Sequence, residues 1–137
     1  MKINLDESSK IRALISGLYQ FDENDLFSQA ALAVTDDELF IYDDHSPTDK
    51  NGGEFHYIIK ERYKIDDVNA ALDEQLMRNR QFKHLGRLNF VVGEDEDEVL
   101  FYYFLNDKKD VQEFIKELKA VGLKVKKFKV DLSPNNL

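Results

Sequence analysis

A stripe of cations gives this chain its strongest candidate for binding chemistry. Lys60, Arg62 and Lys64 alternate with other residues in the segment 54–65. Every second side chain of an extended strand projects from the same face, so the three cations would lie about 6.6 Å apart. Arg87 and Lys83 could add to the stripe if residues 68–80 fold beside it. We predict a tentative interaction surface, with a solvated strand face as the alternative, made of Lys60, Arg62, Lys64, Arg78 and Arg80.

Metal and catalytic chemistry find less support in the sequence. An EF-hand frame starting at Pro47 fails because Pro47 occupies the first ligand position and Ile58 replaces the terminal glutamate. The acidic run 94–98 is typical of a solvated hairpin tip, with calcium binding as the alternative. His45, His56 and His84 show no metal-ligand spacing, and no serine elbow, His-Glu-x-x-His motif or glycine-rich phosphate loop is present. We predict no cofactor, no metal and no catalytic residue.

Composition limits the classes of partner. A chain of 137 residues without cysteine fits one domain, 1–137, in a reducing compartment. No apolar run reaches the length of about 20 residues that spans a bilayer, so we predict a cytoplasmic protein with no transmembrane segment. The net charge of -8 belongs wholly to residues 1–56, and its field repels nucleic acid and anionic lipid. We therefore expect no nucleic-acid partner.

Hydrophobic periodicity predicts the elements that would position these residues. Apolar residues recur at helical spacing in 7–18 and again in 68–80, so we predict a helix over each range. Alternating or apolar runs predict a hairpin over 26–43 and strands over 54–65, 82–92 and 98–105. A long apolar stripe ending at Gly122 predicts a C-terminal helix, formed by Val111, Phe114, Ile115, Leu118 and Val121. The lysine-rich segment 123–130 predicts a basic strand, whose cations we expect to block association through its edge, with nucleic-acid or membrane contact as the alternative.

Residues 34–42 predict a hairpin turn that leads into a strand, Ile65-Asp66 ends the third strand, and the C-terminal helix comes last. The order of these elements resembles the bacterial pleckstrin-homology-like domains, small modules related in fold to PH and GRAM domains. The resemblance rests on a hairpin turn that leads into a strand, the isoleucine-aspartate end of the third strand, and the C-terminal helix. It implies an α+β, mainly β fold: a strongly bent antiparallel sheet or barrel, capped by the helix and preceded by the added helix 7–18. The PH-like core covers about 24–122, and a basic strand with a tail covers 123–137. The hairpin residues that carry it are Val34-Thr35-Asp36-Asp37-Glu38-Leu39-Phe40-Ile41-Tyr42.

The resemblance also implies a protein-binding, non-enzymatic module. PH domains that bind phosphoinositides place basic residues around their first hairpin, which we assign here to the acidic turn 36–38. We therefore expect no phosphoinositide at that position, and a basic protein partner selected by the acidic first part. The alternatives are an acidic, immunity-type inhibitor that masks a basic partner and, third, a small enzyme. A homodimer through an edge strand stays open.

Overall fold

One continuous sheet and one helix make up the described part of the computed structural model, which covers residues 2–3, 11–22, 24, 26–43, 56–77 and 84–131. Two short 3-10 turns, η1 (Ile65–Asp67) and η2 (Leu105–Asp107), lead into β6 and into the helix. The elements in chain order are β1 (Lys2–Ile3), β2 (Ala13–Tyr19), β3 (Ser28–Val34), β4 (Glu38–Asp43), β5 (His56–Lys64), β6 (Val68–Met77), β7 (Leu85–Val92), β8 (Asp97–Phe104), α2 (Lys108–Ala120) and β9 (Val125–Asp131).

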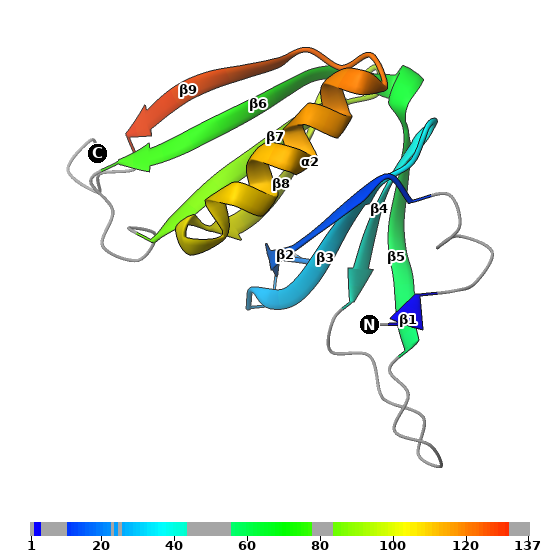
Figure 1. The fold of residues 1–137 in the computed structure, drawn as a ribbon, viewed down its shortest axis with the longest axis horizontal. Coiled ribbons are helices and arrows are strands. Elements are labelled where there is room, and N and C mark those ends of the chain that lie inside the picture. Colours follow the sequence, from blue (N-terminus) through cyan, green and yellow to red (C-terminus); the bar gives the residue numbers. More distant parts are fainter. Residues whose placement is uncertain are drawn as a thin grey trace.

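The sheet has the strand order β1-β5-β4-β3-β2-β8-β7-β6-β9. Its two antiparallel groups, β2 to β5 and β6 to β8, meet at a short seam where Gly17 faces Tyr103 and Leu18 faces Tyr102. The sheet bends there, so that the two groups flank α2 (Figure 1). Two pairings are parallel, β1 with β5 and β6 with β9. The described strands do not close into a barrel, so the barrel alternative is wrong, and the sheet is not purely antiparallel.

The C-terminal helix confirms its prediction. Val111, Phe114 and Leu118 of α2 are buried in the main core beside sheet residues such as Leu32 and Phe90. Their spacing places them on one stripe of the helix, which therefore covers the inner face of the bent sheet. The chain leaves the helix at Gly122, whose φ of 103° lies in the left-handed region that glycine adopts without strain.

The predicted N-terminal helix over 7–18 is wrong for the residues that the structure describes. Residues 13–19 form β2, and residues 7–10 lie outside the described ranges. Ile15 and Tyr19 face the main core, whereas Leu14 packs against a second cluster containing Phe40 and Tyr42. Apolar residues on both faces of this strand coincide with the spacing of a helix, so periodicity alone could not separate the two.

The predicted helix over 68–80 is wrong for the same kind of reason. Residues 68–77 form β6, which pairs with β7 on one side and β9 on the other, and residues 78–80 lie outside the described part. A register shift between Val68 and Ala70 offsets the alternation of the strand. Glu74 is buried in the middle of this strand. Because a glutamate is normally read as an exposed residue, its position did not help to distinguish a strand from a helix.

The predicted hairpin over 26–43 is confirmed as β3 and β4. The hydroxyl of Thr35 stabilises its turn. Thr35 Oγ1 accepts hydrogen bonds from the backbone N–H of Asp37 at 3.3 Å and of Glu38 at 3.0 Å. Thr35 is itself buried, so its hydroxyl satisfies turn amides that would otherwise lack partners. The strands predicted over 54–65, 82–92, 98–105 and 123–130 are present as β5, β7, β8 and β9. No helix in the described ranges is long and apolar enough to cross a membrane.

Candidate functional site

The predicted basic stripe is on β5, but its central member is already paired. Arg62 donates to both carboxylate oxygens of Glu38, at 3.0 and 3.3 Å, and its guanidinium stacks over the ring of Phe40. Lys60 and Lys64 are exposed. Arg78, Arg80 and Lys83 lie outside the described residues.

Arg87 does not extend the stripe, because four strands separate β5 from β7 in the sheet. Its Nε donates to Glu74 at 2.6 Å and its Nη1 donates to the Tyr102 hydroxyl at 3.2 Å. The side chains of Arg87 and Glu74 keep only 12% and 8% of their exposure. Hydrogen bonding to Tyr102 and Glu74 raises the Arg87 pKa against the opposing effect of burial, so this cation is a structural group of the sheet.

The acidic turn 36–38 is also paired within the chain. Asp36 accepts from Arg12 at 2.6 Å, and Arg12 reaches Glu117 of α2 at 3.2 Å. Glu38 pairs with Arg62, as described above. The turn thus fastens the hairpin to α2 and β5, which gives its charges an internal role.

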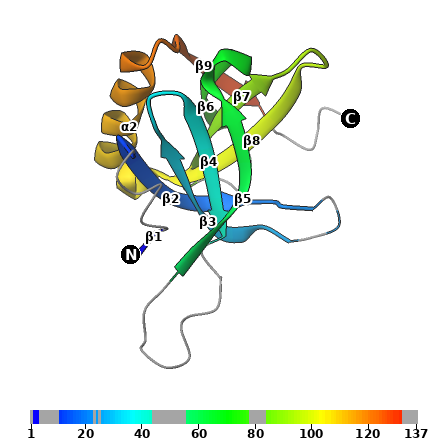
Figure 2. The ribbon, with the colours of Figure 1, turned by 90° about the vertical axis from the view of Figure 1, so that its right-hand side faces the viewer.

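The position of the first hairpin needs correction. The turn 36–38 belongs to the second described hairpin, because β2 and β3 form an earlier one through residues 20–27. The earlier hairpin, formed by β2 and β3, points away from α2 (Figure 2). Its connection contains Asp22, Glu23 and Asp25 and neither lysine nor arginine. The expectation that no phosphate binds at the first hairpin therefore keeps its electrostatic basis, although it was drawn from the wrong turn.

A groove between α2 and the strands β6 and β9 holds a different set of cations. It consists of two adjoining hollows of about 260 and 330 Å³, which share Asp73, Tyr103, Lys108 and Lys127. The first hollow extends along α2, and the second extends past η2 and β9. We call this the lysine groove, after the five lysines among its lining residues: Lys108, Lys116, Lys119, Lys127 and Lys129.

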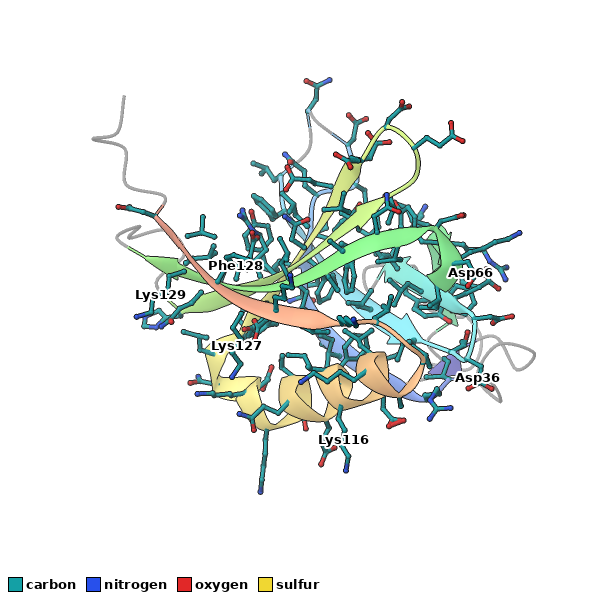
Figure 3. The ribbon with its side chains drawn as sticks, turned by 90° about the horizontal axis from the view of Figure 1, so that it is seen from above. Asp36, Asp66, Lys116, Lys127, Phe128 and Lys129 are labelled. Atoms are coloured by element: carbon teal, nitrogen blue, oxygen red, sulfur yellow. The ribbon has the colours of Figure 1, made fainter. Side chains whose placement is uncertain are left out.

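Helix and strand periodicity together bring these lysines to one groove. Lys108, Gln112 and Lys116 recur every four residues and so lie along one side of α2. Lys127 and Lys129 are two residues apart on β9, so their side chains project from the same face of the sheet. On β6 their direct neighbours are Asp73 and Gln75. Lys127 lies between β9 and α2, and Asp36 and Asp66 lie at the far end of the molecule from Lys129 (Figure 3).

Among the described lining residues of the lysine groove, Asp73 at its floor is the one carboxylate. The Tyr103 hydroxyl donates to Asp73 at 2.6 Å. Burial raises the Tyr103 pKa, and the hydrogen bond to Asp73 raises it further, so the hydroxyl remains a neutral donor. Gly86 lies under the Tyr103 ring, since a Cβ at residue 86 would come closer than 3.0 Å to ring atoms and the hydroxyl. The missing side chain on β7 thus leaves room for this ring.

The sequence predicted the basic strand that forms one wall of this groove, but it did not predict the groove. The β9 lysines were interpreted as protection of a strand edge, and the α2 lysines were assigned no role. Only the parallel pairing of β9 with β6 places the two sets across a groove. The available signal was the combination of Lys108 and Lys116, two helical repeats of four residues apart, with lysines two residues apart on the next strand.

The described part of the chain contains no group of three or more His, Cys, Asp or Glu side chains that could hold a metal ion. His84 is exposed, His45 lies outside the described residues, and the side chain of His56 does too. The acidic run 94–98 is exposed at the tip between β7 and β8, as predicted for a solvated hairpin tip.

Comparisons with known proteins find similarity in structure alone. No protein-family model matches the chain, and no curated protein does. A solved complex of the PDZ-RhoGEF DH/PH domains with GTP-γ-S activated RhoA is similar with a TM-score of 0.46 and 10% identity, over 86% of this chain and 31% of that one. A ternary complex of human RhoA, its inhibitor and the DH/PH domain of human ARHGEF11 gives 0.48 and 10%, over 85% and 30%. This chain spans less than a third of the length of either chain.

Proposed function

We propose that this chain is a non-enzymatic, PH-like interaction module that binds an acidic segment of a partner protein in the lysine groove. A bent sheet with one C-terminal helix against its inner face supports the PH-like part of the proposal. The observation that carries the binding part is the lining of the groove, where five lysines face a single carboxylate. The rest of the chain is acidic, so this groove is a local exception to a net charge of -8.

The size of the groove suits an extended segment. Eleven residues of α2 separate Lys108 from Lys119, a length of roughly 16 Å along the helix axis. An extended chain covers about 3.3 Å per residue, so about five residues would lie between these two lysines. Glutamate or aspartate side chains of such a segment could reach lysines on both walls, from α2 and from β9.

The chemistry of the floor favours binding over catalysis. Tyr103 stays protonated because its pKa is raised, which disfavours a phenolate nucleophile or base. Asp73 already accepts the Tyr103 hydrogen bond. The groove thus offers lysines that would attract an acidic ligand, and its floor is held in place by the hydrogen bond between Tyr103 and Asp73.

A fluorescein-labelled peptide with the sequence Glu-Glu-Leu-Glu-Glu tests the proposal by fluorescence anisotropy. We expect saturable binding that weakens as salt increases, because exposed charges are screened. Replacing Lys116, Lys119 and Lys127 together by serine should weaken binding by about tenfold, since each contact is worth roughly 0.5 kcal/mol. The triple variant should unfold at the same temperature as the parent, because all three side chains are exposed.

The matched control replaces Lys60, Lys64 and Lys124 by serine, which removes the same charge from exposed lysines outside the groove lining. We expect less than about a twofold change in affinity from it. Equal weakening by both triple variants would mean that only net charge matters. Weakening by the control alone would place the binding surface outside the lysine groove and sink the proposal.

A second candidate is an acidic inhibitor that masks a basic partner. The exposed run 94–98 favours it, because Asp67 accepts a backbone hydrogen bond from Gly93 and so brings two further exposed carboxylates, Asp66 and Asp67, beside that tip. Replacing Glu94, Asp95 and Glu98 by their amides would separate the candidates. Loss of a basic partner captured from the native cell would support the inhibitor, and unchanged capture would exclude the tip.

A further inference from the structure

Asp73 occupies the point where the two hollows of the lysine groove meet. It lines both of them, together with Tyr103, Lys108 and Lys127. The lysines that belong to only one hollow lie to either side: Lys116 and Lys119 in the first, and Lys129 in the second. Asp73 therefore places a negative charge at the centre of the groove, where Lys108 and Lys127 also line both hollows.

Asp73 has no ion-pair partner in the described part of the chain, although Lys108 and Lys127 line the same part of the groove. Its contact there is the hydrogen bond from Tyr103, a neutral group whose pKa is raised by burial. Lys127 faces Asp73 in the register of β6 and β9, yet no ion pair within 4.0 Å joins the two. A carboxylate beside the central residue of a ligand would repel any anion placed there.

Apolar groups line the hollow on each side of this central position. Val111 and Ile115 of α2 and Leu105 of η2 line the groove on either side of the Tyr103 ring. Leu105 keeps 41% of its exposure, and Ile115 is half-buried. An uncharged side chain at the centre of the ligand would cover these groups and gain the favourable free energy of apolar burial.

We infer that Asp73 sets the specificity of the groove, which takes an extended segment with acidic residues on both sides of one uncharged, apolar residue. This inference rests on the proposed function, because it describes the ligand of the same groove. A peptide with five consecutive acidic residues carries more charge but places one carboxylate against Asp73. The preferred ligand is thus the less charged of the two, a ranking opposite to that of simple charge attraction.

Two peptides of equal length test the inference by anisotropy at one salt concentration: Glu-Glu-Leu-Glu-Glu and penta-glutamate. The parent protein should bind the leucine-centred peptide at least about threefold more tightly. In Asp73→Asn the order should reverse, because the amide still accepts the Tyr103 hydrogen bond while the negative charge is gone. Tyr103→Phe, which keeps the charge, should keep the parent's preference.

Each result has one meaning. Tighter binding of penta-glutamate by the parent would overturn the inference and leave the proposed function standing. A preference for the leucine-centred peptide that persists in Asp73→Asn would also overturn it, because apolar contact alone would then explain the ranking. Binding of neither peptide would refute the proposed function as well. If Asp73→Asn unfolds, Asp73→Ser replaces it and must show the same reversal.

Discussion

At the scale of single residues, burial decides which charged pairs hold this molecule together. The Arg87–Glu74 pair and the Arg62–Glu38 pair both join neighbouring strands. The first keeps 12% and 8% side-chain exposure, and the second keeps 48% and 24%. Loss of one partner from a buried pair leaves an uncompensated charge in the interior, whereas water replaces a lost partner at the surface.

Substitution of each arginine by methionine should separate these two cases. Methionine keeps an unbranched side chain and removes the charge. We expect Arg87→Met to lower the free energy of unfolding by about 3–5 kcal/mol, because Glu74 stays buried without its cation. Arg62→Met should cost less than about 2 kcal/mol, including its contact with Phe40. Urea unfolding measures both, and equal losses would contradict the role assigned to burial.

Tyrosine hydroxyls set the alkaline limit of stability. Tyr19 and Tyr63 both donate to Glu61. Burial, followed by this hydrogen bond, raises the pKa of each above the ordinary value of 10.0. A folded-state pKa above the unfolded value gives stability that is complete below pH 10 and is lost as the pH rises further.

Unfolding measured from pH 7 to pH 11.5 tests this expectation. Each tyrosine should steepen the loss above pH 10 by up to about 1.4 kcal/mol per pH unit. The double variant Tyr19→Phe, Tyr63→Phe should be less stable at pH 7 but lose stability less steeply above pH 10. Some loss should remain, because burial also raises the Tyr103 pKa. Parallel curves for parent and variant would refute the assignment.

At the scale of elements, the seam between β2 and β8 joins the two antiparallel groups of strands through two residue pairs. A Cβ at residue 17 would lie closer than 3.0 Å to the Tyr102 carbonyl oxygen and to the Phe101 ring. Backbone cannot yield there without separating the two strands. Gly17 therefore permits the close approach that joins the two groups of strands.

Gly17→Ala should thus cost at least about 1–3 kcal/mol, the usual range for overpacking a core. Ser16→Ala, at an exposed position of the same strand, should change stability by less than about 0.5 kcal/mol. Hydrogen exchange gives the second measurement: amides of β2 and β8 at the seam should exchange faster in Gly17→Ala than those of the β3–β4 hairpin. A uniform increase over the whole sheet would argue against a local seam.

The same strands show why the sequence predicted some elements and not others. α2 and the β3–β4 hairpin were predictable because their signals are local: one apolar stripe with a glycine stop, and one threonine that caps its own turn. β2 and β6 were mistaken for helices because both of their faces contact other groups. Leu14 and Ile15 pack into two different clusters, and Glu74 is buried by a cation from β7. Such contacts depend on strand order, which periodicity does not encode.

The candidate site was predictable to the same extent: local sequence signals predicted some of its residues, and contacts between distant strands were missed. Lys127 and Lys129 were predicted as part of a basic strand and Tyr103 as part of the strand 98–105, whereas Asp73 was assigned no role. The sequence separation of Asp73 and Tyr103 is 30 residues, and only the packing of β6 near β8 brings the two side chains together. The stripe of Lys60, Arg62 and Lys64 was predicted correctly as a strand face, but pairing with Glu38 removes its central charge from use.

At the scale of the whole molecule, the lysine groove attracts an acidic ligand that the net charge of -8 repels. Six residues of β8 separate Asp97, near the acidic tip, from Tyr103, a distance of roughly 20 Å. Two unit charges at that distance in water interact by about 0.2 kcal/mol. Removal of two negative charges at the tip would then lower the repulsion of a ligand with four charges by up to about 1.6 kcal/mol without salt, and by about half of that at 0.01 M salt.

This balance predicts an effect on association without an effect on dissociation. The double variant Glu94→Gln, Asp95→Asn should bind Glu-Glu-Leu-Glu-Glu about two- to fourfold faster at 0.01 M salt. The dissociation rate should not change, because the tip does not line the groove. At 0.15 M salt the Debye length of about 8 Å is far shorter than the separation, so the two association rates should converge. Stopped-flow anisotropy measures both rates, and a slower dissociation in the variant would mean that the tip contacts the ligand directly.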